Sequence, residues 1–95
     1  MPRFTRVAEF DADEAAADRF VSMINAESGP PEGVPATGIT VLRGRDSGKL
    51  RVVTFFETED DLRQGSATLD GMSPDNEGMR RLSVETFEIL AERQL

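Results

Sequence analysis

Few side chains in this sequence could do chemistry, and the most informative of them is an arginine within an apolar strand pattern. Arg6 follows Phe4 and precedes Ala8 on one face of a segment that alternates between two faces. A guanidinium in an apolar pocket can anchor an anionic or enolate oxygen. Two alternatives stay open: Arg6 reaches solvent at the rim, or it pairs with an acid such as Glu88 on a neighbouring strand.

Four other residues are candidates for lining a pocket with Arg6. Thr54 offers a hydroxyl and Phe56 an aromatic wall on one face of a single strand, while Met23 and Met72 offer flexible apolar side chains. Each also has a structural alternative, because threonine suits strands, aromatic rings fill cores and methionines at helical spacing often do the same. The sequence therefore predicts pocket residues without assigning a catalytic role to any of them.

The residue types that are missing limit the chemistry. The sequence contains no His, Cys, Trp or Tyr. This removes the usual proton shuttle near neutral pH, the common zinc and haem ligands, and every Ser-His or Cys-His nucleophile. We therefore expect no cofactor and no metal. The lack of cysteine also excludes disulfides and favours a cytoplasmic location.

Composition and charge indicate one acidic domain that spans residues 1–95. The net charge is -7, from 18 acidic and 11 basic residues, and the basic residues form no cluster. Binding to a nucleic acid backbone needs clustered positive charge, so we expect no nucleic acid partner. No segment approaches the roughly 18 apolar residues of a membrane span, and the opening residues lack the apolar run of a signal peptide, so we expect no membrane association.

The periodicity of apolar residues predicts the elements that must position these side chains. In order, they are a strand over 3–10, a helix from a cap at Asp11 to about Ser28, strands over 37–43 and 50–57 joined by a turn at 44–48, a helix after a cap at Thr58, and a strand over 82–91. This βαββαβ order predicts an α+β, ferredoxin-like fold, in which two helices cover one face of a four-stranded antiparallel sheet. Gly65 and Gly71 interrupt the second helix and predict loose packing that leaves room for a pocket.

The strand Leu50–Phe56 is apolar on both of its faces, although two helices cover only one face of such a sheet. A patch of this size is large for a soluble monomer, and a twofold homodimer would hide it. The alternative is that the loop 29–35 and the residues after the last strand cover the patch within one chain. The candidates for the dimer interface are Leu42, Val53, Phe55, Phe87 and Ile89.

Two segments carry a resemblance to a known family. The first is VVTFFETEDDL at 52–62, an apolar strand that leads through an aromatic residue and a Thr cap into an acidic first turn, and the second is VETFEIL at 84–90. With the order of elements, the chain resembles the dimeric α/β-barrel family of ferredoxin-like domains, in the antibiotic-biosynthesis monooxygenase-like group. The resemblance implies a dimer with a ligand cavity between sheet and helices, and Phe56 stands where many members have a Trp that lines this cavity.

The resemblance also disfavours some activities. Haem-degrading members use a His on the second helix and an Asn on the first strand, whereas this helix has no His and Arg6 lies in the region of the Asn. We expect a homodimer that binds a small apolar or aromatic ligand between sheet and helices. The alternative is a cofactor-independent oxygenase acting on a small aromatic or quinol-type substrate. A cavity of at least roughly 300 Å³ beside Phe56 and Arg6 would support ligand binding.

Overall fold

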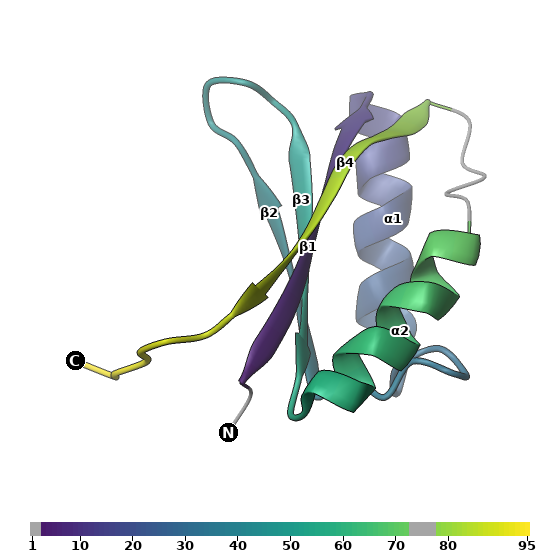
Figure 1. Ribbon diagram of the computed structural model, residues 1–95. Coiled ribbons are helices and arrows are strands. Elements are labelled where there is room, and N and C mark those ends of the chain that lie inside the picture. The colour runs from purple at the N-terminus through teal and green to yellow at the C-terminus, as the bar shows by residue number, and fades with distance from the viewer. Residues whose placement is uncertain (1–2, 73–77) are drawn as a thin grey trace.

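The computed structural model describes residues 3–72 and 78–95 and confirms the predicted ferredoxin-like α+β fold. Both helices lie on the same side of the antiparallel sheet (Figure 1). The elements are, in chain order, β1 (Phe4–Ala12), α1 (Glu14–Ala26), β2 (Gly38–Arg43), β3 (Leu50–Phe56), α2 (Glu59–Gly71) and β4 (Met79–Glu88).

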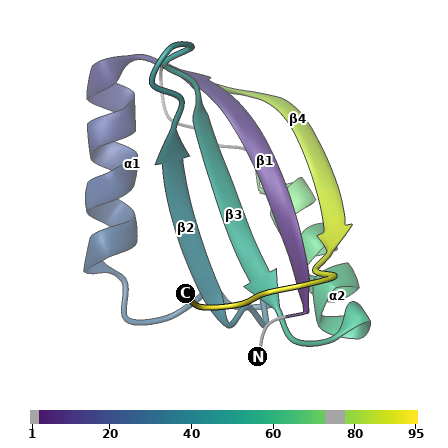
Figure 2. The ribbon, with the colours of Figure 1, turned by 90° about the vertical axis from the view of Figure 1, so that its left-hand side faces the viewer.

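The strands are arranged in the order β2-β3-β1-β4, so β3 and β1 are central (Figure 2). Their positions alternate between the side that faces the helices and the open side, because successive strand residues point to opposite faces. Arg6 pairs with Thr54 of β3 on the helix side, while the next residue, Val7, pairs with Val53 on the open side. This register determines which side chains can reach a site beneath the helices.

An irregularity in β1 changes which residues of β4 face the helices. The pairing of β1 with β4 shifts register between Glu9 and Phe10, so that Glu9 pairs with Ser83 and Phe10 with Arg81. Leu82 is the extra residue between these two pairs, as in a β-bulge. The shift places Arg81 on the helix side of the sheet, whereas uninterrupted alternation would place it on the open side.

The termini of three elements, β1, α1 and β4, differ from the prediction. β1 continues to Ala12 because Asp11 and Ala12 still pair with the start of β4, which begins at Met79 rather than at residue 82. The predicted cap at Asp11 is therefore wrong. Asp13 caps α1, and its Oδ1 accepts a hydrogen bond from the backbone N–H of Ala16 at 2.7 Å.

The second helix begins as predicted, but its packing differs from the prediction. Thr58 caps α2 through its Oγ1, which accepts a hydrogen bond from the backbone N–H of Asp61 at 3.1 Å. Gly65 is buried against the ring of Phe56, and a Cβ at this position would collide with that ring. Gly65 thus lets the backbone of α2 pack tightly against Phe56 of the sheet, and the prediction that it loosens the packing here is wrong.

Among the described residues, the buried apolar side chains form two separate clusters. One cluster lies beneath α1 and consists of Ala8, Phe10, Ala16, Ala17, Leu50, Val52 and Met79. The other lies beneath α2 and consists of Val34, Phe56 and Leu62. Within the described ranges, no helix is long and apolar enough to cross a membrane.

Candidate ligand-binding site

A cavity of about 640 Å³ opens on the helix side of the sheet. It is bordered by α1, by the inner face of the sheet, by the segment between α1 and β2, and by the C-terminal end of α2. This volume falls within the range of roughly 300–1,000 Å³ that is usual for sites of small molecules. The cavity therefore has the size and position that a ligand site between sheet and helices requires.

The walls of the cavity are mainly apolar. One wall is α1, which contributes Phe20, Met23 and Ile24 at the spacing of a single helical face. The opposite wall is the sheet, where Ile39 and Val52 contribute side chains. Ile39 is 44% exposed and Met23 is 46% exposed, which are high values for apolar side chains in a domain of this kind. An apolar molecule in the cavity would remove this surface from water.

Two adjacent polar residues of the central strands border this apolar space. Arg6 and Thr54 pair directly across β1 and β3, so their side chains lie next to each other on the helix side. Each of the two residues is only 4% exposed. Buried polar groups nearly always have a hydrogen-bond partner. The partners of Arg6 therefore decide how much of its charge and hydrogen-bonding capacity is left for a ligand.

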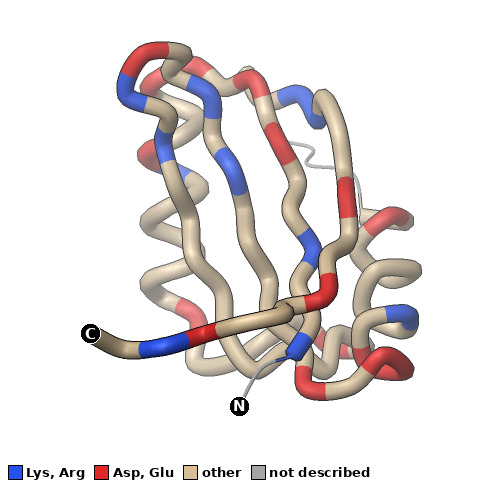
Figure 3. The backbone as a smooth tube through the Cα atoms, turned by 60° about the vertical axis from the view of Figure 1, so that its left-hand side comes forward, with Lys and Arg blue, Asp and Glu red and all other residues tan. Residues whose placement is uncertain are grey.

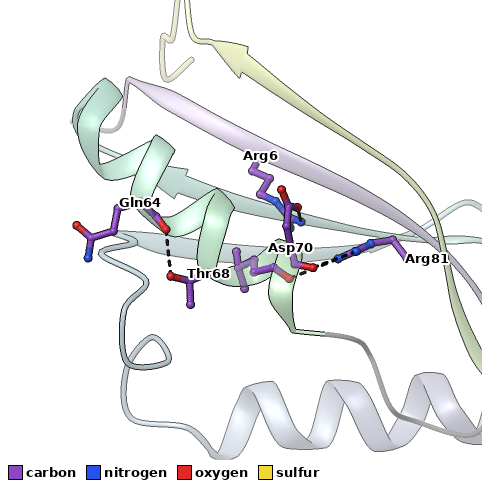
Figure 4. Close-up of polar contacts among 6 residues, drawn as sticks. Arg6, Gln64, Thr68, Asp70 and Arg81 are labelled. Carbon is purple, nitrogen blue, oxygen red and sulfur yellow. Dashed lines mark hydrogen bonds and ion pairs between the residues drawn. The ribbon is translucent and has the colours of Figure 1, made fainter.

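Arg6 is bound by an acid of α2, not by the predicted candidate Glu88. Its Nη2 donates to Oδ1 of Asp70 at 2.7 Å, and both groups are drawn in Figure 4. The side chain of Arg6 is 5% exposed and that of Asp70 is 56% exposed. The ion pair therefore consists of a buried guanidinium and a solvent-exposed carboxylate. The sequence-based alternative that Arg6 pairs with an acid is therefore correct in kind, although the partner is a different residue.

A second arginine borders the same end of the cavity. Arg81 donates from Nη1 to the backbone oxygen of Leu69 and from Nη2 to that of Asp70, at 3.4 Å in each case (Figure 4). These carbonyl groups belong to the last turn of α2, where a cation also suits the helix dipole. Arg81 was not among the predicted pocket residues, because the alternation of β4 gives no sign of the register shift that turns it towards the helices.

The segment between α1 and β2 forms part of the cavity wall and packs against α2. Val34 is 3% exposed and packs with Phe56 and Leu62 in the cluster beneath α2. The Oγ1 of Thr68 donates to the backbone oxygen of Gly33 at 3.0 Å, which ties this segment to α2. The segment thus lies on the helix side, and it does not cover the open face of the sheet as one sequence-based alternative required.

The predicted pocket residues occupy different positions relative to the cavity. Arg6, Met23, Thr54 and Met72 line it. Phe56 is fully buried beneath α2 and is not among the lining residues. The reason is its contact with Gly65, which lets the helix backbone cover the ring.

Most of the predicted interface residues share the open face of the sheet. Leu42, Val53, Phe55 and Phe87 occupy positions of this face in the register, whereas Ile89 lies beyond the end of β4. Phe87 is 41% exposed and Leu42 is 48% exposed. In Figure 3 the halves of β2 and β3 away from their hairpin carry no charged residues.

Of the charged residues that line the cavity, Arg6 and Arg81 are cationic and Glu27 is acidic. Among the described residues, no three acidic side chains come together in a way that could hold a metal ion. Arg6 and Arg81 can bind or stabilise negative charge, and Thr54 can offer a hydroxyl.

A scan of protein-family models finds no match to this chain, and a search of curated proteins also finds none.

Proposed function

We propose that the protein binds a small apolar or aromatic molecule between its sheet and its two helices. The observation that carries this proposal is the apolar cavity of about 640 Å³ with a buried arginine at its border. A compact domain gains stability by filling such a space with side chains, so an open cavity of this size is consistent with an occupant. The resemblance of this chain to the antibiotic-biosynthesis monooxygenase-like group supports the same location for a ligand.

A ligand screen by NMR tests this proposal with two matched variants of α1. Met23 lines the cavity and is 46% exposed, whereas Val21 is 38% exposed and does not line it. We expect 2-naphthamide to bind the natural protein, Met23→Trp to weaken this binding by filling the cavity, and Val21→Trp to leave it unchanged. Equal binding by both variants would contradict the proposed location.

The alternative function is a cofactor-independent oxygenase that acts on a small aromatic or quinol-type substrate. The buried guanidinium of Arg6 favours it, because a cation in an apolar site stabilises the anion of an electron-rich substrate before it reacts with oxygen. Uptake of dissolved oxygen with 1,4-dihydroxynaphthalene tests this alternative. An enzyme would raise the rate above that of buffer, and Arg6→Met would abolish the increase. A rate equal to that of buffer would leave ligand binding as the function.

We also propose that two copies of the chain associate through their open sheet faces. The support is the uncharged strip that includes Val53 and Phe55, flanked towards the hairpin by the ion pair of Arg51 and Glu9 at 3.1 Å. The described residues after β4 do not hide the strip: they extend away from the sheet in Figure 1, and Leu90 is 86% exposed. A twofold interface here would leave the cavity open, because the cavity lies on the opposite face of the sheet.

A further inference from the structure

The guanidinium of Arg6 is only partly satisfied by the protein. Its side chain is 5% exposed, and its Nη2 donates to Asp70 at 2.7 Å. Among the residues that the structure describes, no group accepts a hydrogen bond from its Nε–H, and this nitrogen is buried. A buried donor without an acceptor is costly, and more so on a charged group. Because Arg6 lines the cavity, a small shift of its side chain would bring this donor to a molecule there, which would supply the missing acceptor.

The charges near this donor favour an anion. The charged residues that line the described cavity are Arg6, Arg81 and Glu27. Glu27 is exposed at the C-terminal cap of α1. Within residues 3–72 and 78–95, Arg81 donates to uncharged carbonyl oxygens at 3.4 Å, and the carboxylate on Arg6, that of Asp70, is 56% exposed and partly screened by solvent. Arg6 is thus paired with an exposed carboxylate, and Arg81 has no carboxylate partner among the described residues, which leaves a positive charge beside the apolar space.

We propose that the ligand is a monoanion in which one carboxylate or phenolate group is attached to an apolar body. Its oxygen accepts the Nε–H of Arg6, and its body lies against the apolar wall formed by Met23, Ile39 and Val52. This inference rests on the proposed function and specifies the chemistry of the ligand. Asp70 then acts as a competitor for Arg6, because its carboxylate occupies the neighbouring Nη2.

Two probes of the same shape test the charge requirement. 2-Naphthoate and 2-naphthamide differ mainly in their charge, and each is titrated into the natural protein by calorimetry and followed by NMR. We expect the carboxylate to bind about tenfold more tightly or better, since hydrogen bonds between charged groups are the stronger ones. We also expect the side-chain Nε–H resonance of Arg6 to shift with the carboxylate and to shift less with the amide.

Variants separate the role of Arg6 from a general effect of charge. Arg6→Met should remove the preference for the carboxylate, while Arg63→Met, which changes an exposed arginine of α2 outside the cavity, should retain it. Asp70→Asn should strengthen binding of the carboxylate several-fold by removing its competitor, and Asp60→Asn on the same helix should not. The Nε–H measurement needs no variant and so remains decisive if Arg6→Met does not fold.

The outcomes distinguish this inference from the proposed function. Equal binding of the two probes, with no response of the Arg6 Nε–H, would overturn the anionic ligand and leave the apolar site standing. Failure of both probes to bind would overturn the proposed function, and the inference with it. Preferential binding of the carboxylate that survives Arg6→Met would also overturn the inference, because the anion would then be held elsewhere.

Discussion

The ring of Phe56 on β3 lies directly beneath the backbone of Gly65 on α2. Phe56 is completely buried, and a Cβ at position 65 would overlap its ring. Because Gly65 has no side chain, the middle of α2 can pack close to the sheet. This contact keeps Phe56 out of the cavity, and Arg6 and Thr54 border the cavity on the sheet instead.

The contact predicts that Gly65→Ala destabilises the fold, although alanine is the better helix former. Overpacking costs about 1–3 kcal/mol, whereas replacing glycine within a helix gains only about 1 kcal/mol. The matched control is Gly71→Ala in the same helix, where a Cβ meets no atom within 4 Å. Urea unfolding should show a loss of stability for the first variant and none for the second. Equal stability of both variants would mean that α2 does not approach Phe56 so closely.

The cap of α1 gives a prediction that separates two neighbouring acids. Asp13→Ala should lower the free energy of unfolding by about 0.5–2 kcal/mol, because Asp13 holds the N–H of Ala16. Asp11→Ala should change it by less than about 0.5 kcal/mol, because the 3.6 Å ion pair of Asp11 with Arg80 is exposed at both ends. Thermal unfolding measures both variants, and a larger loss at Asp11 would contradict the observed cap.

The order of elements is predictable from the sequence because each helix and strand has its own apolar period. The exact ends are less predictable. Asp11 satisfies the local pattern of a helix cap, but the pairing of β1 with Met79 and Arg80 continues the strand past it. These partners lie far along the chain, so no local pattern reveals them.

The residues of the candidate site are likewise only partly predictable from local sequence patterns. Arg6, Thr54 and Met23 could be selected from the sequence because strand and helix periods place them on inward faces. Asp70 could not be selected, because the packing of α2 brings it to Arg6 from 64 positions away. Arg81 reaches the cavity because of the register shift between β1 and β4, which reverses the faces of Met79, Arg80 and Arg81 without any signal in the alternation of β4.

Association through the open face predicts a dimer in light scattering at micromolar concentration, with about 1,200 Å² or more of total surface buried. Phe55→Asp should dissociate or unfold the protein, because the change places a charge in an apolar contact. Phe87→Asp lies at a more exposed position and should dissociate the dimer while retaining the circular dichroism of the fold. Val21→Asp on α1 is the control and should remain dimeric. A monomeric natural protein would contradict the proposed interface.

The ion pair of Arg6 and Asp70 predicts that a variant without the carboxylate of Asp70 loses stability and binds an anionic ligand more tightly. Asp70→Asn leaves the buried guanidinium without its counter-charge and should destabilise the protein by about 1 kcal/mol or more, since unpaired buried charges are costly. 2-Naphthoate should raise the melting temperature of this variant more than that of the natural protein, because ligand binding stabilises the native state. An unchanged stability together with an equal ligand effect would indicate that Asp70 is not coupled to the site.

The binding of an apolar molecule beneath the helices is tested most directly at two adjacent valines of β3. Val52 lines the cavity, while Val53 lies on the open face of the same strand. Methyl NMR during titration with 2-naphthoate and 2-naphthamide should show shifts at Val52, together with Ile39 and Leu69, and little change at Val53. Shifts at Val53 with none at Val52 would place the ligand on the open face and contradict a site between the sheet and the helices.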